Sequence, residues 1–258
     1  MLNLEELCTQ VQQIAREAGT FLKEERRKFD RTRVEEKSAH NYVSYVDKES
    51  EKWLIAQLSA LLPEAGFIAE EGSGSLTDEN YCWLVDPLDG TSNYIHDVAP
   101  YCVSIALRNK EELLIGVVYE VCRDECFYAW KGSKAYLDGR EIHVSDLDKA
   151  FIDLGFPYNS DAYRPVALRL VDRLYGFAGG TRLMGAAAAE VCYIAAGRFE
   201  ARIEAWIGPW DIAAGALILM QAGGKVTDFS GGDNWQSGDE VLATNGAMHE
   251  TLMQLVRE

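Results

Sequence analysis

The stretch from Tyr81 to Ala99, which reads YCWLVDPLDGTSNYIHDVA, decides how the rest of the chain is interpreted. It opens with five mostly aromatic or branched residues and then turns abruptly into DPLDGT at 86–91. An apolar run of this length bounded by a Pro/Gly turn predicts a buried strand. Because Pro87 fixes one φ angle and removes one N–H, the chain turns between Asp86 and Asp89 and can bring both carboxylates to the same side.

A strand followed by two carboxylates, a glycine and hydroxyl residues is typical of a site for a metal ion and a phosphate. Asp86 and Asp89 offer the hard oxygen ligands that Mg²⁺ prefers. Gly90 allows close approach of the backbone, and the N–H groups of Gly90 and Thr91 can receive an anion where a short helix begins. The alternative is an ordinary turn, since Asp-Pro and Asp-Gly are common turn pairs. A plain turn leaves the acidic residues elsewhere in the chain unexplained.

The composition predicts one globular domain over 1–258. Of the 258 residues, 48% are hydrophobic and 26% are charged, which is enough to bury a sizeable core. No apolar run approaches the roughly 20 residues that cross a bilayer. The acidic, amphipathic N-terminus MLNLEELCTQ is not a signal peptide. The six cysteines are scattered, mostly in apolar runs, which predicts free thiols and a cytoplasmic protein.

The charge balance excludes two classes of partner. A formal net charge of −16 repels nucleic acid and anionic membranes, so non-specific binding to either is excluded. The same field repels a phosphate ester. An acidic protein that handles phosphate needs cations in between, which agrees with a Mg²⁺ site in the 86–91 stretch.

The first half of the chain, about 1–146, predicts helices beside a run of paired strands. We expect a helix at 4–22, an extended piece at 42–47, a helix that ends before Pro63, and a strand at 66–69. Strands at 101–107, 113–119 and 126–130 predict a meander, and Asp138-Gly139 predicts a hairpin turn. The charged stretch 24–37 is either a solvated helix end or a mobile loop.

The second half, about 147–258, alternates strands with helices and shows no linker. Strands are expected at 151–155, 199–205, 225–229 and 240–243, and helices at 166–174, 185–197, from Trp210 to about Gly223, and from about Ala247. Three further acids stand at element ends: Asp47 at an N-cap position, Glu70 after the strand 66–69, and Asp211 at a helix N-terminus. Each can be a simple cap or a solvated turn. Together with the 86–91 stretch, they can complete a metal site.

Four pieces, taken together, resemble the inositol monophosphatase family of lithium-sensitive, Mg²⁺-dependent phosphatases. They are IAEEG at 68–72, WLVDPLDGTSN at 83–93, Gly185 with the small-residue helix after it, and WDIAAG at 210–215. Their order and separations fit over nearly the whole chain. The resemblance implies a layered α/β fold, an α+β sandwich in which a part with helices on an antiparallel sheet packs against a smaller α/β part. It also implies that the site lies between the two parts, and that the protein is a homodimer.

The resemblance implies metal ligands, catalytic groups and substrate contacts. The ligands of two or three Mg²⁺ ions are Glu70, Asp86, Leu88 (through its carbonyl), Asp89 and Asp211. The catalytic residues are Glu70 and Thr91, which orient the attacking water, and Asp47, which holds Thr91. The substrate contacts are Gly90, Thr91, Ser92, Ala186, Ala187, Glu204 and Asp211, with Glu204 placed to hold a substrate hydroxyl.

Three positions depart from the family pattern. Ala69 stands where glycine is usual, Ser44 where threonine is frequent, and Ala186 where threonine or serine is frequent. The metal ligands are intact, so these changes bear on the identity of the substrate and leave catalysis in place.

We therefore expect hydrolysis of inositol 1-phosphate, or of a similar small polyol phosphate, by a water activated by Mg²⁺. Fructose 1,6-bisphosphate and 3′-phosphoadenosine 5′-phosphate are the alternative substrates, although Tyr94-Ile95-His96 and Glu204 favour inositol phosphate. An aspartyl-phosphate mechanism is disfavoured because two residues, and not one, separate Asp86 from Asp89. A non-catalytic regulator that binds metal or inositol phosphate is disfavoured because no ligand is lost.

Overall fold

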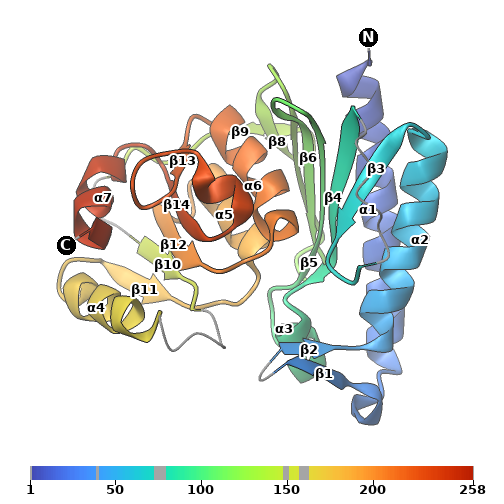
Figure 1. Cartoon of the computed structure of the whole chain (residues 1–258), viewed down its shortest axis with the longest axis horizontal. Coiled ribbons are helices and arrows are strands. Elements are labelled where there is room, and N and C mark those ends of the chain that lie inside the picture. Colours follow the sequence, from blue (N-terminus) through green and yellow to red (C-terminus); the bar gives the residue numbers. More distant parts are fainter. Residues whose placement is uncertain (1, 39–40, 73–79, 148–150, 157–162, 258) are drawn as a thin grey trace.

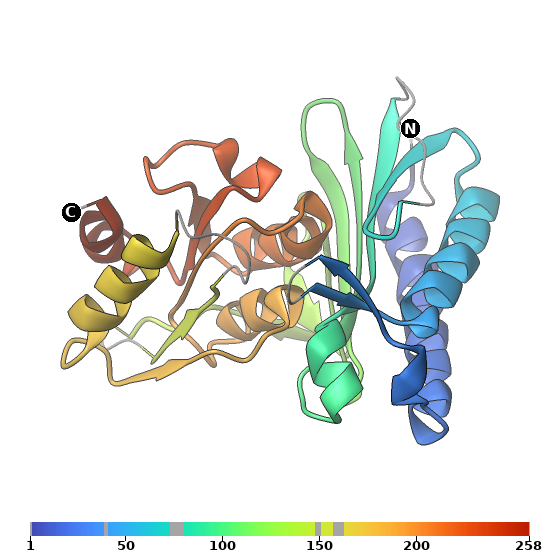
Figure 2. The same cartoon turned by 60° about the horizontal axis from the view of Figure 1, so that its bottom comes forward.

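The computed structural model describes residues 2–38, 41–72, 80–147, 151–156 and 163–257. Its elements stack in five layers, in the order helices, sheet, helices, sheet, helices (Figure 1). Helices α5 (Ala187–Ala195) and α6 (Pro209–Gln221) lie between the two sheets, which the turned view in Figure 2 also shows. This mixed, layered arrangement confirms the expected fold class. Among the described residues, no helix is both long enough and apolar enough to cross a membrane.

The first sheet has seven strands in the order β3-β4-β5-β6-β7-β8-β9. The strands are β3 (Ala65–Ala69), β4 (Tyr81–Asp89), β5 (Cys102–Asn109), β6 (Leu113–Glu120), β7 (Glu125–Trp130), β8 (Ala135–Leu137) and β9 (Arg140–Ile142). β3 and β4 are parallel, and all the later neighbours are antiparallel, as the predicted meander requires. The turn Asp138-Gly139 has φ angles of 48° and 81°, which is the left-handed pair that an Asp-Gly hairpin favours.

The strand β4 continues through the DPLD segment instead of ending at Val85. Its pairing with β5 joins Asp86 to Ser104 and Asp89 to Cys102, so β4 carries one residue more than its partner and bulges. Pro87, which has no N–H to donate to the ladder, lies inside this bulge. Gly90 then takes a left-handed φ of 88° and begins the short helix α3 (Thr91–His96), as expected.

The charged stretch 24–37 begins as the end of a helix and continues as a short 3₁₀ turn and a strand. Helix α1 (Leu4–Arg27) extends to Arg27, a 3₁₀ turn η1 (Arg31–Arg33) follows, and β1 (Glu35–Ser38) pairs with β2 (Asn41–Val43). Helix α2 (Tyr45–Leu61) is capped by Ser44, so the expectation that Asp47 is the N-cap was wrong by three residues. Asp47 is the other half of the capping box, because its Oδ2 accepts the Ser44 N–H at 2.9 Å.

The second sheet has five strands in the order β11-β10-β12-β14-β13. They are β10 (Phe151–Leu154), β11 (Gly180–Arg182), β12 (Ala201–Ala205), β13 (Lys225–Thr227) and β14 (Glu240–Thr244). Helices α4 (Arg164–Leu174) and α7 (His249–Arg257) cover its outer face (Figure 1), and a 3₁₀ turn η2 (Asn234–Ser237) precedes β14. The short strand β11 has no counterpart among the predicted elements.

Both faces of the first sheet are buried. On β5, Val103, Ile105 and Leu107 belong to the core shared with α1 and α2, whereas Cys102 and Ala106 belong to the core shared with α5 and α6. This alternation follows from the two-residue period of a strand. The small residues of α5 and α6 allow both helices to fit between the sheets, which brings the N-terminus of α6 to the carboxylates of β4.

Gly116 on β6 packs directly against the backbone of α6. A Cβ atom at this position would lie 2.5 Å from the carbonyl oxygen of Ala214. Gly116→Ala should therefore push α6 away and lower the free energy of unfolding by about 1–3 kcal/mol. Because α6 carries Asp211, activity should fall as well. Thermal unfolding and a rate assay on the purified variant check this, and a variant equal to the parent in both would contradict the packing described.

His249 lies buried between two threonines, and its titration makes the stability of the fold depend on pH below neutrality. Its ring is 1% exposed and lies 3.1 Å from Thr227 Oγ1 and 2.9 Å from Thr244 Oγ1. Burial, with a smaller contribution from Lys225, lowers the pKa of His249 to about 4. Between pH 6.5 and 4, His249 is protonated in the unfolded chain but stays neutral in the folded chain. The free energy of unfolding therefore falls as the pH drops through this window, by up to about 3 kcal/mol.

Denaturant unfolding at pH 7, 5.5 and 4.5 measures this loss. His249→Gln should remove much of the difference between pH 7 and 4.5. The same change at His143, whose side chain is 62% exposed, should leave the profile as it is. An unchanged slope in His249→Gln would contradict the assignment.

Candidate metal and phosphate site

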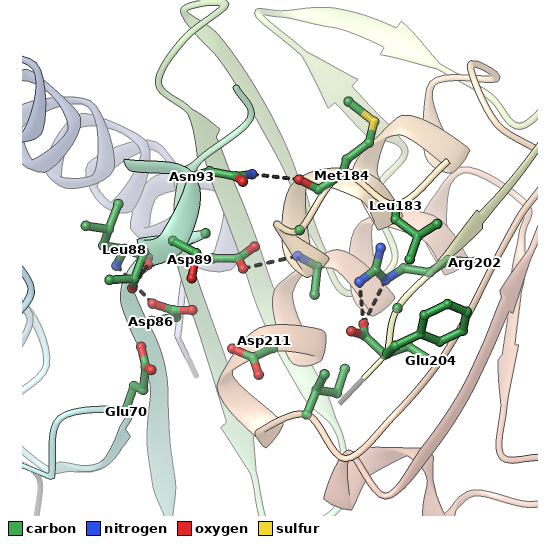
Figure 3. Close-up of a pocket in the computed structure, with 18 of the residues that line it drawn as sticks. Glu70, Asp86, Leu88, Asp89, Asn93, Leu183, Met184, Arg202, Glu204 and Asp211 are labelled. Carbon is green, nitrogen blue, oxygen red and sulfur yellow. Dashed lines mark hydrogen bonds and ion pairs between the residues drawn. The ribbon is translucent and has the colours of Figure 1, made fainter. Parts of the chain in front are cut away.

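A cavity of about 560 Å³ lies between the two halves of the chain. Its lining comes from the 86–93 segment on one side, and from residues 154–156, 183–185, β12 and α6 on the other. Figure 3 shows Glu70, Asp86, Asp89 and Asp211 turned toward one space, with Arg202 and Glu204 across from them. The family resemblance implied a site between two parts of the chain, and the structure has a cavity at that place.

Three carboxylates converge at one end of this cavity. Asp86, Asp89 and Asp211 each offer an oxygen, and these atoms all lie within 4.8 Å of one another. Asp86 is 2% exposed and Asp89 is 7% exposed, both on the bulged end of β4. Asp211 comes from the first turn of α6. Sequence reasoning therefore identified residues that the fold brings together from positions more than 120 apart.

Backbone N–H groups fix each of the three carboxylates. Asp86 accepts from Leu88 N at 2.9 Å, and Asp211 accepts from Gly208 N at 2.7 Å. Asp89 accepts from the first turn of α5, with Ala187 N at 3.1 Å and Ala188 N at 2.7 Å. A helix N-terminus favours negative charge, so α5 stabilises the charged form of Asp89 and orients its carboxylate. Backbone hydrogen bonds therefore orient all three carboxylates.

The carboxylates raise one another's pKa. Burial raises the pKa of Asp86 well above its ordinary value, and the nearby charges of Glu70 and Asp211 raise it further. Burial also raises the pKa of Asp211 well above its ordinary value, followed by the charges of Asp89 and Glu70. For Asp89, burial raises the pKa, and hydrogen bonds from Ala188 and Cys102 oppose the shift. Like charges gathered this closely in a buried place need a counter-charge.

This donor set fits a divalent cation with a preference for oxygen. All the groups that converge are carboxylate oxygens, and the described residues place no sulfur or imidazole ligand in the group. Glu70 lines the same cavity from the end of β3, but it stands outside the group of three. It acts on Asp86 and Asp211 through its charge.

A hydroxyl and a buried carboxylate lie beside the cluster. Thr91 Oγ1 is 2.8 Å from Asp47 Oδ1 and 3.1 Å from the Leu88 carbonyl oxygen. Asp47 is fully buried at the start of α2. Burial raises the pKa of Asp47, and the hydrogen bonds from Ser44 and Thr91 oppose that shift. The pairing of Thr91 with Asp47 that the resemblance implied is present in the geometry.

The turn at Gly90 is closely packed. A Cβ atom there would lie 3.0 Å from the Pro100 carbonyl oxygen and 3.2 Å from the Ala186 Cβ, so this turn requires glycine by space as well as by φ. Ser92 and Ala187 line the cavity, whereas Ala186 is fully buried behind it at the N-cap of α5. Asn93 ties the two halves together, because its Nδ2 donates to the carbonyls of Pro100 and Met184 (Figure 3).

Arg202 and Glu204 form the opposite wall. Arg202 Nε donates to Glu204 Oε2 at 2.9 Å, and both residues line the cavity (Figure 3). Burial raises the pKa of Glu204, and the Arg202 guanidinium opposes the shift. Sequence reasoning gave a role to Glu204 but none to Arg202. It also missed the apolar wall formed by Leu154, Phe156, Leu183, Met184 and Ile207.

Comparison with known proteins gives one consistent result. The model of the inositol monophosphatase family matches residues 3–258. Nus factor SuhB of Escherichia coli K12 is 34% identical over 249 residues, covering 95% of this chain and 93% of the relative. Nus factor SuhB of Pseudomonas aeruginosa is 36% identical over 255 residues, covering 94% and 93%.

Solved structures of similar proteins have the same fold. The extragenic suppressor protein suhB from Bartonella henselae has a TM-score of 0.89 at 32% identity, covering 95% of this chain and 96% of that one. Inositol monophosphatase from Anabaena has a TM-score of 0.87 at 30% identity, covering 99% and 97%. The likeness therefore spans nearly the whole chain, including both sheets.

Proposed function

The chain belongs to the inositol monophosphatase family, and from this premise we propose that it is a Mg²⁺-dependent phosphatase of small phosphate monoesters, with inositol 1-phosphate or a similar polyol phosphate as its substrate. The observation that carries the proposal is the convergence of Asp86, Asp89 and Asp211 within 4.8 Å, beside the Thr91–Asp47 hydrogen bond. The Anabaena relative is named an inositol monophosphatase, which supports the choice of substrate. The name Nus factor belongs to the curated relatives, and no described feature of this chain leads to it.

The three carboxylates, together with Glu70 and the Leu88 carbonyl, would hold two or three Mg²⁺ ions. Bound there, Mg²⁺ lowers the pKa of water and stabilises negative charge on the phosphate and on the leaving oxygen. The chain itself supplies rigid anchoring: the N–H groups of Leu88, Ala188 and Gly208 fix the carboxylates before binding. Ligands that are already oriented need no rearrangement during the reaction, so no free energy is lost to it.

Thr91 orients the attacking water. When Asp47 is ionised its oxygens only accept hydrogen bonds, so the Thr91 hydroxyl donates its single proton to Asp47 at 2.8 Å. The lone pairs of Thr91 Oγ1 are then free to accept a hydrogen bond from water, with Glu70 as a second acceptor. The N–H groups of Gly90 and Thr91, with the Ser92 hydroxyl, bind the phosphate, and Glu204 accepts a hydrogen bond from a hydroxyl of the leaving group.

Thr91→Val should lower kcat by about 100-fold or more, because the change removes the acceptor that aligns the water and keeps the size of the side chain. Thr91→Ser keeps the hydroxyl and should retain activity within about tenfold. Steady-state phosphate release by the two variants measures the difference. Equal losses in both would show that bulk at this position matters and the hydroxyl does not.

A substrate panel tests the proposed function. Phosphate release from inositol 1-phosphate, fructose 1,6-bisphosphate and 3′-phosphoadenosine 5′-phosphate is measured with Mg²⁺, with and without Li⁺. We expect preference for the inositol ester and inhibition by Li⁺. Preference for another ester would contradict the proposed substrate but leave the proposed phosphatase site in place. No release from any ester would refute the proposal.

The homodimer stays a prediction of the family resemblance. Light scattering on the purified protein decides it, because a dimer has twice the 28.8 kDa of one chain. A mass of one chain at working concentration would refute it.

A further inference from the structure

Arg202 is the only cation among the described residues that line the cavity, and it is already engaged. Its side chain is 2% exposed and forms ion pairs with Asp153, Glu190 and Glu204. Arg202 and Glu204 both lie on β12, whereas Asp153 comes from β10 and Glu190 from α5. Three carboxylates thus surround one guanidinium, and no positive charge on this wall is left over for a ligand.

The side chain of Glu204 is held on two sides. Arg202 donates to Glu204 Oε2 from both Nε and Nη2, so one carboxylate oxygen is fixed and the other, Oε1, stays outside this fork. On the other side, the Glu204 carboxylate lies over the Cα of Gly155, where any Cβ atom would collide with Oε1 and Cδ. Both Gly155 and Glu204 line the cavity. Glu204 is therefore positioned by contacts on both sides of its carboxylate.

A fixed carboxylate with no free cation beside it treats two classes of leaving group differently. A neutral hydroxyl can donate to the carboxylate, in a hydrogen bond strengthened by its charge. A second phosphate would bring negative charge toward Glu204. Arg202 cannot compensate for it, because its charge is already paired with Asp153 and Glu190. A like charge brought beside a buried carboxylate without a counter-charge is disfavoured.

We propose that Arg202 and Gly155 position Glu204 as a selectivity filter, which accepts a neutral, hydroxyl-bearing leaving group and rejects a second phosphate. This rests on the proposed function and narrows its substrate class to monophosphates of polyols. Arg202 and Gly155 act through Glu204 and are positioning residues, because the carboxylates that would hold the metal ions and the reacting phosphate, Asp86, Asp89 and Asp211, lie across the cavity from Arg202.

Three esters separate the filter from the catalytic end. Inositol 1-phosphate offers hydroxyls to Glu204, fructose 1,6-bisphosphate brings a second phosphate, and p-nitrophenyl phosphate has a leaving group with neither. Glu204→Gln should raise KM for inositol 1-phosphate about 10- to 100-fold, because a charged acceptor becomes a neutral one. It should also lower KM for the bisphosphate, because the second phosphate then meets a neutral side chain.

Gly155→Ala tests the positioning directly. The added methyl collides with the far end of the Glu204 side chain, so the fold should survive and the carboxylate should swing away. We expect a rise of about tenfold in KM for inositol 1-phosphate with kcat unchanged. In a Glu204→Ala background the same change should have no further effect on selectivity, since the group it displaces is gone.

Arg202→Lys keeps the charge and loses the fork, so it should raise KM for the inositol ester about tenfold without altering kcat for p-nitrophenyl phosphate. Glu200→Gln is the matched control, because this buried acid neighbours the same strand and binds Ser145 Oγ and Phe151 N outside the cavity. It should leave the preference among the three esters unchanged, even where it lowers stability.

The outcomes separate the inference from the proposed function. If the parent protein releases no phosphate from p-nitrophenyl phosphate or inositol 1-phosphate, the proposed function fails. If the parent is active but Glu204→Gln and Gly155→Ala keep its preference among the three esters, the filter is refuted and the phosphatase stands. A parent that prefers the bisphosphate also refutes the filter.

Discussion

Asp211→Asn should lower kcat/KM for the inositol ester by about 100- to 1,000-fold and leave the fold intact. Asp211 is one of three carboxylates within 4.8 Å, so removing its charge weakens the hold on the cation and the stabilisation of charge on the leaving oxygen. A loss of about 3–4 kcal/mol of transition-state stabilisation corresponds to this range. The asparagine oxygen can still accept the Gly208 N–H that Asp211 accepts at 2.7 Å, so α6 keeps its cap.

The melting temperature of Asp211→Asn without Mg²⁺ should equal or exceed that of the parent. The charge of Asp211 raises the pKa of Asp86, so its removal relieves repulsion in the empty cluster. Asp172→Asn on the exposed side of α4 is the control and should change neither quantity. Activity of Asp211→Asn within threefold of the parent would exclude Asp211 from the metal site.

Arg202→Met should lower the free energy of unfolding by about 3–5 kcal/mol. The guanidinium is 2% exposed and forms ion pairs with Asp153, Glu190 and Glu204, of which the first two are fully buried. Methionine fills a similar volume but leaves these carboxylates without a counter-charge, which is the costly way to break a buried pair. Denaturant unfolding at neutral pH measures the loss.

A second substitution distinguishes lost charge from lost packing. Adding Glu190→Gln to Arg202→Met removes one of the stranded charges and should recover part of the stability, about 1–2 kcal/mol. Glu190→Gln alone should cost less than Arg202→Met alone, because Arg202 keeps Asp153 and Glu204 as partners. A loss below 1 kcal/mol in Arg202→Met would show that the buried network contributes little to the fold.

The local parts of the fold could be predicted from the sequence because their signals are local. The buried strand before the DPLD segment, the short helix that begins after Gly90 and the hairpin at Asp138-Gly139 depend mainly on neighbouring residues. The start of α2 shows the limit. Ser44 and Asp47 are the two halves of one capping box, and either can be taken for the N-cap until hydrogen bonds are seen. The hairpin β1–β2 was missed because EEKS at 35–38 carries no strand pattern.

The candidate site divides in the same way. Asp86, Asp89 and Asp211 were found through motifs, and the fold brings them together. The partners of Arg202 were not found, because Asp153 and Glu190 lie on other elements and meet it only when α5 packs against the second sheet. Ala187 was predicted as a substrate contact and Ala188 was given no role, yet the N–H groups of both fix Asp89. Backbone donors of this kind leave no trace in side-chain identity.

Phosphate release from inositol 1-phosphate as a function of Mg²⁺ concentration tests the central claim most directly. The protein is first treated with a chelator and dialysed, and the initial rate is then followed as Mg²⁺ is added. Hydrolysis that is absent without Mg²⁺, rises to saturation with it, and is lost in Asp211→Asn is the predicted result. Release that persists in the chelator, or that never appears at any Mg²⁺ concentration, would contradict it.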